Sequence, residues 1–158
     1  MRKMQIILKE NIEETRRFFY DYLKELSQFD STIEFDSDGT PIYNWFDNYW
    51  EEKERYPFLL CVENKFAGLA LIREVGIKKY EIAEFYVIEE YRKDGNALWF
   101  ASQIVKMFDG TFLFSTRIEN KRAIRFWDKF VVQFDYNKSE IKDSYKNWVI
   151  KTNNKTEF

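Results

Sequence analysis

The stretch Ile82-Ala83-Glu84-Phe85-Tyr86-Val87-Ile88-Glu89-Glu90-Tyr91-Arg92-Lys93-Asp94-Gly95-Asn96-Ala97 predicts a strand, a short turn and the start of a helix that runs to about Met107. The free backbone N–H groups of a helix that begins there point back toward the end of the strand. Together with the positive end of the helix dipole, they form an anion site that suits phosphate. Gly95 and Ala97 carry no large side chain, so a bulky ligand can approach the backbone closely. The stretch therefore predicts a phosphate-bearing ligand lying along a strand that ends in this turn.

The composition is that of a folded domain. Of the 158 residues, 45% are hydrophobic and 20% are aromatic, which is enough for a core and argues against disorder. We expect one domain over residues 1–152 and a loose C-terminal tail over residues 153–158. The net charge of −2 does not favour nucleic acid as a partner.

Several classes of protein and of chemistry are excluded. No apolar run approaches the roughly 20 residues of a membrane span, and the basic N-terminus continues into Lys9-Glu10, which is not the pattern of a signal peptide. The single cysteine, Cys61, fits a reducing cytoplasm. The sequence contains no histidine, which excludes a Ser-His-Asp triad, a Cys-His pair and a His-ligated zinc site. Chemistry must therefore depend on carboxylates, tyrosines, lysines or the backbone, and we expect a cytoplasmic protein with no membrane partner and no metal.

The order of predicted elements is strand, helix, helix, three strands, helix, strand, helix and two strands. The strands are expected at Met4–Leu8, Phe58–Glu63, Phe66–Arg73, Tyr80–Ile88, Thr111–Arg117, Val131–Tyr136 and Trp148–Lys151. The helices are expected from Asn11 to about Ser27, from Pro41 to Trp50, over Asn96–Met107, and from Asn120 through Phe130. Thr111–Arg117 shows little alternation, which predicts burial on both faces, and Leu98, Ala101, Ile104 and Val105 form the predicted buried face of their helix. An antiparallel meander with helical crossovers predicts an α/β (α+β) fold with a mixed, mostly antiparallel sheet of about seven strands and helices on both faces.

Two motifs carry a resemblance to a known family. Arg92-Lys93-Asp94-Gly95-Asn96-Ala97 matches the Arg/Gln-x-x-Gly-x-Gly/Ala signature of the GNAT superfamily of N-acetyltransferases. Asn120-Lys121-Arg122-Ala123-Ile124-Arg125-Phe126-Trp127 resembles their second signature, Asn-x-x-Ala-x-x-Phe-Tyr. The spacing of the motifs and the order of elements also match, over nearly the entire chain. The stretch from Tyr49-Trp50 to Leu59 resembles a little-characterised bacterial branch of predicted acetyltransferases in that superfamily.

The resemblance implies an acyl-CoA N-acyltransferase fold and acetyl-CoA as the cosubstrate. It implies that the strand carrying Phe85-Tyr86-Val87 is splayed from Thr111–Arg117, and that the pantetheine arm inserts there as a pseudo-strand. The pyrophosphate would sit on the backbone N–H groups of the turn, and the N–H of Val87 could polarise the thioester carbonyl. The cofactor-binding residues implied are Phe85, Tyr86, Val87, Arg92, Lys93, Asp94, Gly95, Asn96, Ala97, Asn120, Ala123 and Trp127.

The reaction implied is direct attack of a primary amine on the acetyl thioester. An alkyl amine has a pKa of roughly 10.4 and arrives protonated, so a carboxylate must accept its proton. Glu84 and Glu81 are the candidates, and in a regular strand they face opposite sides. We favour Glu84, which is nearest the expected thioester position. The alternative is that Glu84 binds the substrate ammonium or bonds a neighbouring strand.

The group that protonates the departing thiolate is open. The family usually places a tyrosine where this sequence has Trp127, and an indole is no useful acid. A thiol pKa of roughly 8.5 makes the thiolate a fair leaving group without help, and Tyr86 or Tyr136 could substitute. Packing is the favoured role of Trp127. The substitution also motivates a second function, a catalytically degenerate CoA-binding sensor or interaction module; a purely structural domain is a third.

The acceptor is not identified by the sequence. Trp45, Tyr49 and Trp50 could line its pocket or pack in the core. The acidic loop Asp30–Asp38 could attract a cationic acceptor or simply be solvated. Arg92 could pair with phosphate or with Glu89 or Glu90. A homodimer is left open.

Overall fold

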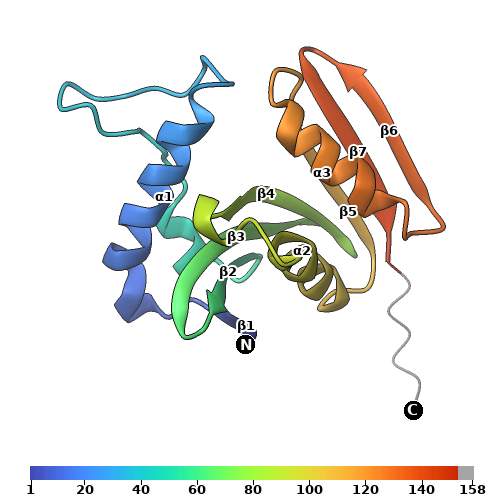
Figure 1. The fold of residues 1–158 in the computed structure, drawn as a ribbon, viewed down its shortest axis with the longest axis horizontal. Coiled ribbons are helices and arrows are strands. Elements are labelled where there is room, and N and C mark those ends of the chain that lie inside the picture. The colour runs from blue at the N-terminus through green and yellow to red at the C-terminus, as the bar shows by residue number, and fades with distance from the viewer. Residues whose placement is uncertain (153–158) are drawn as a thin grey trace.

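A computed structural model describes residues 1–152, so the predicted tail at 153–158 lies outside the described residues. The chain forms a seven-stranded sheet in the order β1-β2-β3-β4-β5-β7-β6 (Figure 1). The strands are β1 Arg2–Ile6, β2 Arg55–Val62, β3 Lys65–Gly76, β4 Lys79–Val87, β5 Thr111–Arg117, β6 Asn137–Lys142 and β7 Tyr145–Lys151. Neighbouring strands are antiparallel, except that β4 and β5 are parallel. The predicted mixed, mostly antiparallel sheet is confirmed.

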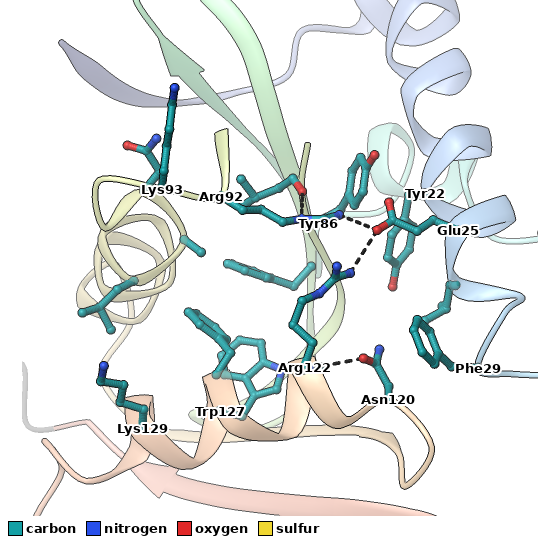
Figure 2. Close-up of a pocket in the computed structure, with 18 of the residues that line it drawn as sticks. Tyr22, Glu25, Phe29, Tyr86, Arg92, Lys93, Asn120, Arg122, Trp127 and Lys129 are labelled. Carbon is teal, nitrogen blue, oxygen red and sulfur yellow. Dashed lines mark hydrogen bonds and ion pairs between the residues drawn. The ribbon is translucent and has the colours of Figure 1, made fainter. Parts of the chain in front are cut away.

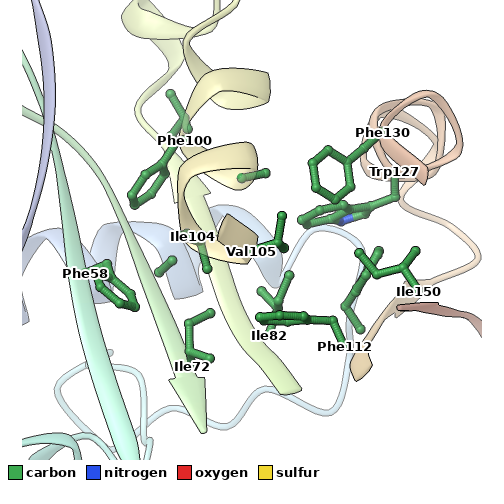
Figure 3. Close-up of a cluster of buried hydrophobic side chains, with 14 of the residues drawn as sticks. Phe58, Ile72, Ile82, Phe100, Ile104, Val105, Phe112, Trp127, Phe130 and Ile150 are labelled. Atoms are coloured by element: carbon green, nitrogen blue, oxygen red, sulfur yellow. The ribbon is translucent and has the colours of Figure 1, made fainter. Parts of the chain in front are cut away.

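Helices cover both faces of this sheet, as predicted. They are α1 Ile12–Leu26, α2 Asn96–Lys106 and α3 Lys121–Val131, with short 3₁₀ helices η1 Lys9–Asn11, η2 Asp47–Trp50 and η3 Glu89–Tyr91. Side chains alternate along β3, so Leu69 and Leu71 pack toward α1 and η2, whereas Ala70 and Ile72 pack toward α2 and α3. The larger core lies under α2 and α3, where Phe100 and Trp127 both reach the sheet (Figure 3).

Strand β4 departs from regular pairing on both of its edges. Toward β3, Ile72 pairs with Ile82 but Leu71 pairs with Glu84, so Ala83 is an extra residue that forms a β-bulge. Toward β5, pairing covers only Lys79–Glu81 with Thr111–Leu113. From Ile82 to Val87 this edge of β4 has no partner strand within the described chain, which is the splay that the resemblance implies.

The predicted helix from Pro41 is wrong. Pro41 forms an isolated bridge with Phe35, and only Asp47–Trp50 is helical, as 3₁₀ helix η2. The aromatic side chains of this segment contact separate parts of the fold and do not form one apolar stripe on a helix. Phe46 stacks on Phe19 of α1 at 4.9 Å between ring centroids, and Trp50 donates its indole N–H to the carbonyl of Ile7 at 2.9 Å.

Three further expectations need correction. The strand predicted at Val131–Tyr136 is wrong, because α3 continues to Val131 and β6 begins only at Asn137. Every residue of β6 is exposed, so this edge strand lacks the apolar alternation that would reveal it. Strand β5 has the predicted bounds, but the prediction that both of its faces are buried is wrong, because only the face with Phe112 and Phe114 is buried. In α2, Leu98 is 43% exposed and Phe100 is buried in its place.

Candidate functional site

A cleft of about 440 Å³ lies where β4 and β5 diverge (Figure 2). Its walls are the end of β4, the turn before α2, one side of α3 and the C-terminal part of α1. Among its lining residues are Phe85, Tyr86, Val87, Arg92, Lys93, Gly95, Asn96, Ala97, Asn120, Ala123 and Trp127. These are all the predicted cofactor-binding residues except Asp94, so the two motifs, which are far apart in the sequence, meet in one cleft. Asp94 and Glu84 do not line it.

The free edge of β4 faces this cleft. The N–H of Ile88 donates to the carbonyl of Ala67 at 2.8 Å, on the β3 side. Backbone polar groups alternate in direction along a strand, so those of Val87 point to the opposite edge. In agreement, the Val87 carbonyl accepts a 2.7 Å hydrogen bond from Nε of Arg92, which lines the cleft. The N–H of Val87 therefore lies on the cleft side of the strand.

The turn before α2 presents the helix N-terminus to the cleft. Gly95 occupies the N-cap position with a φ of 70°, a left-handed conformation that glycine adopts without strain. The first turn of α2 contains no acidic side chain, so none there neutralises the positive end of the helix dipole. The backbone carbonyl of Asp94 accepts from Nη1 of Arg2 at 2.9 Å, which joins this turn to β1. The buried Asn96 donates to the carbonyl of Tyr91 at 2.9 Å and fixes the turn.

A charged bridge crosses the cleft from α1 to α3. The carboxylate of Glu25 pairs with Arg92 at 2.8 Å and with Arg122 at 3.0 Å, and Figure 2 shows the three groups converging. Arg92 thus pairs with Glu25, not with Glu89 or Glu90 as considered above. Nη1 of Arg92 is buried and has no hydrogen-bond partner within residues 1–152.

Trp127 is packed among aromatic rings. Its ring lies 5.1 Å from Phe85, 4.8 Å from Phe126 and 4.5 Å from Phe114, and the residue is 6% exposed. This surrounding is apolar, as the predicted packing role requires. Of the two tyrosines considered as the acid, only Tyr86 lines the cleft, and burial raises its pKa to about 12.

Glu84 lies beside a second cavity of about 290 Å³. This cavity is lined by Tyr43, Trp45, Tyr49, Arg55, Arg73, Glu81, Ala83 and Glu84. Tyr22 links it to the cleft, because Tyr22 lines the cleft and donates its hydroxyl to Oε2 of Glu84 at 2.5 Å. Burial raises the pKa of Glu84 to about 7; the hydrogen bond from Tyr22 opposes this rise, and the charges of Glu81 and Asp30 add to it.

The bulge at Ala83 overturns the expectation that Glu81 and Glu84 face opposite sides. The extra residue shifts the alternation, so both carboxylates line the second cavity. They are not equivalent, because Arg73 donates to both oxygens of Glu81 at 3.0 and 3.2 Å. Glu84 forms no ion pair with any described residue.

Several residues that line the first cleft were not predicted from the sequence. Tyr22, Glu25, Leu26 and Phe29 come from α1 and the residues just after it, and Arg122, Phe126 and Lys129 come from α3. Tyr22 and Leu26 are four residues apart and share a face of α1, which Phe29 extends just beyond the helix, so their spacing is the signal that could have found them. Leu98 also lines the cleft, which explains its exposure. Among residues 1–152, no three or more His, Cys, Asp or Glu side chains are grouped so that they could hold a metal ion, and no helix is long and apolar enough to cross a membrane.

The fold is that of the acyl-CoA N-acyltransferases. The family model described as "Acetyltransferase (GNAT) family" matches residues 15–131, and the chain belongs to this family.

Solved structures share the fold at low sequence identity. The ribosomal-protein-S18-alanine N-acetyltransferase from Escherichia coli is similar with a TM-score of 0.63 and 11% identity, over 100% of this chain and 99% of that one. The PaiA N-acetyltransferase from Thermoplasma acidophilum, solved in complex with coenzyme A, has a TM-score of 0.66 and 13% sequence identity, over 96% of this chain and 99% of that one. A mutant of the spermidine N-acetyltransferase from Vibrio cholerae has a TM-score of 0.63 and 11% sequence identity, over 94% of each chain. No curated protein sequence matches this chain at a significant level.

Proposed function

We propose that the protein transfers the acetyl group of acetyl-CoA to a primary amine by direct attack of the amine. The observation that carries the proposal is the unpaired edge of β4, which lies beside a cleft that ends at the N-terminus of α2. An extended polar arm can pair with such an edge as an added strand. Phosphate groups can accept from the backbone N–H groups of the turn Arg92–Ala97.

The charges of the cleft support a polyanionic donor. Four lining side chains are cationic, namely Arg92, Lys93, Arg122 and Lys129, and Glu25 is the single anionic one. The whole chain, by contrast, carries a net charge of −2. A locally positive cleft on an acidic protein attracts a ligand with several phosphates. Lys93 and Lys129 lie on opposite sides of one end of the cleft (Figure 2), where they would meet phosphates.

The chain's own residues supply the remaining roles. The donor brings a thioester carbonyl, and the N–H of Val87 would stabilise the charge that develops on its oxygen. Glu84 would accept the proton of the attacking amine, because a carboxyl with a pKa of about 7 is poised near neutral pH. Tyr86 could donate a proton to the leaving thiolate, because Tyr86 lines the same cleft.

A second candidate is a CoA-binding sensor without turnover. Two observations favour it: the apolar packing of Trp127 at the usual acid position, and the Glu25 bridge that spans the cleft. Calorimetry with acetyl-CoA and transfer assays across an amine panel separate the two. Binding without transfer to any amine supports the sensor. If millimolar acetyl-CoA does not bind, both proposals fail.

Gly95→Glu tests the donor site. A carboxylate about 5 Å from a phosphate charge opposes it by roughly 2–3 kcal/mol at an effective dielectric constant of about 20–40, or roughly 30- to 150-fold in affinity. Gly39→Glu is the matched control, because Gly39 also has a positive φ of 78° and space around its Cβ position. We expect calorimetry to show weaker acetyl-CoA binding for Gly95→Glu alone, with similar unfolding free energies for both variants. If the two variants bind acetyl-CoA with equal affinity, the turn at Gly95 is not part of the donor site.

A further inference from the structure

The second cavity has a charge pattern that selects among amines. Two guanidinium groups line it, those of Arg55 and Arg73, together with the carboxylates of Glu81 and Glu84. Arg73 is paired with Glu81, and Arg55 is paired with Glu52 at 3.1 Å. Glu84 is therefore the lining carboxylate left for a cation, and a second positive charge on the ligand would face two guanidinium groups.

The guanidinium of Arg73 keeps hydrogen-bonding capacity for a ligand. Glu81 accepts from its Nε and Nη2, and a guanidinium has five N–H donors. Nη1 has no partner among the described residues. Leu71, opposite Glu84, and Arg73, opposite Glu81, are two residues apart on β3, which places the two positions roughly 7 Å apart along the strand. A carboxylate and a guanidinium thus face one cavity at a spacing that a short chain can span.

The hydroxyl of Tyr49 gives the cavity a third polar group. Tyr49 is 2% exposed, and its hydroxyl makes no hydrogen bond of good geometry to another described residue, although the side chains of Arg55 and Tyr43 approach it. A buried polar atom left in this way keeps an unrecovered desolvation cost, so its presence in the lining of a cavity points to a ligand group that completes its hydrogen bonding. The guanidinium carbon of Arg55 lies 5.0 Å from the centroid of the Tyr49 ring, and its charge lowers the pKa of the Tyr49 hydroxyl against the rise that burial causes, so the hydroxyl belongs to the cationic part of the cavity. Tyr43 and the exposed Trp45 provide apolar walls.

We propose that the acceptor is a short amine that also carries a carboxylate, with its amine at Glu84 and its carboxylate at Tyr49 and Arg73. The proposal rests on the proposed function, because it identifies the acceptor class of that reaction. It separates this protein from an acetyltransferase for diamines or polyamines, whose second ammonium group would meet Arg55 and Arg73 where this ligand has its carboxylate.

Three amines of equal chain length test the class: 5-aminopentanoate, pentylamine and 1,5-diaminopentane. We expect kcat/KM for the aminocarboxylate to exceed that of the other two by at least tenfold. Equal values for the three, or preference for the diamine, would overturn the proposal while leaving acetyl transfer intact. Shorter and longer aminocarboxylates, from 4-aminobutanoate to 6-aminohexanoate, then locate the best spacing.

Tyr49→Phe tests the residue that most sharply marks the site. It removes a hydroxyl that makes no hydrogen bond of good geometry to another described residue, so we expect an unchanged or raised Tm. The KM for 5-aminopentanoate should rise about fivefold or more, with no change for pentylamine. Tyr56→Phe is the matched control, because Tyr56 packs on the other face of the sheet, against the core under α2. A lowered Tm with equal loss for both amines would mean that the hydroxyl is structural and would contradict the proposal.

Arg73 is tested together with its partner, because Arg73→Gln alone leaves Glu81 unpaired beside Glu84. The double variant Arg73→Gln/Glu81→Gln keeps the net charge, and it should abolish the preference for 5-aminopentanoate over pentylamine. NMR titration of the three amines into the protein without acetyl-CoA provides a readout that needs no turnover. Selective binding of the aminocarboxylate that Tyr49→Phe weakens supports the proposal even if acetyl transfer fails. If the protein acetylates amines but shows no such selectivity in binding or in kcat/KM, the proposed acceptor class is refuted and the proposed acetyltransferase function is not.

Discussion

Glu84→Gln is the substitution whose consequences follow most directly from the structure. Glutamine keeps the shape of the side chain and retains an oxygen that can accept the hydroxyl of Tyr22, so the change removes little besides the ionisable proton. Burial raises the pKa of Glu84 from its ordinary value of 4.5 to about 7. The folded protein therefore holds this proton more tightly than the unfolded chain does.

The sign of the pH dependence follows from this difference. Because the folded-state pKa is the higher one, the stability that the protonated carboxyl contributes is fully present below about pH 4.5. It is lost as the pH rises to about 7. The two pKa values differ by an amount equivalent to at most about 3 kcal/mol, and the residual exposure of Glu84 makes this an upper bound.

Urea unfolding of both proteins at pH 5, 6, 7 and 8 measures the effect. We expect the free energy of unfolding of Glu84→Gln minus that of the wild type to increase with pH by about 1–3 kcal/mol and to level off above pH 7. Subtraction cancels the other titrating groups that both proteins share. The same buffers give kcat/KM, which should rise through about pH 7 in the wild type alone. A pH-independent difference in stability would refute the reasoning about burial, and wild-type turnover by Glu84→Gln at every pH would show that Glu84 is not the base.

Two other substitutions probe the surroundings of this strand. The hydrogen bond from Tyr22 lowers the pKa of Glu84, so Tyr22→Phe should move the acidic limb of the kcat/KM profile to higher pH; an unmoved limb would separate the two residues functionally. Gly68 has space for no side chain, because a Cβ there would lie 2.4 Å from the carbonyl oxygen of Tyr86. Gly68→Ala should therefore displace the cleft edge of β4, cost about 1–3 kcal/mol in urea unfolding and weaken acetyl-CoA binding in calorimetry; full affinity would show that this edge does not bind the donor.

The cleft residues of the proposed donor side could be predicted because they belong to local sequence motifs. A strand, a glycine turn and a helix N-terminus follow one another between Ile82 and Ala97, and the backbone groups that matter belong to that same stretch. The cap at Asn120 is local too, and its side chain accepts from the N–H of Ala123 at 3.2 Å as expected. Neither feature depends on a partner distant in the sequence.

The remaining features depend on tertiary contacts that a single sequence does not specify. Glu25 reaches the cleft only because α1 packs beside β4, and its two arginine partners come from a turn and from α3. The residues between Pro41 and Trp50 have helical spacing but are held by contacts with α1 and with the backbone near β1. The bulge at Ala83 is defined only by its register against β3, which no property of β4 alone reveals.

That bulge explains how one strand serves two cavities. With regular alternation, a strand that turns Phe85 and Val87 toward the core under α2 and α3 would turn Glu81 the same way and bury its charge there. The extra residue at Ala83 lets Glu81 remain on the side of Arg73 while Ile82 is buried. It also places Glu81 beside Glu84 in the second cavity, and Glu84 is three positions before Val87, whose N–H lies on the cleft side of the strand. The inserted residue therefore brings Glu81 to the same side as Glu84, and the pairing of Glu81 with Arg73 leaves Glu84 as the carboxylate that can receive the amine.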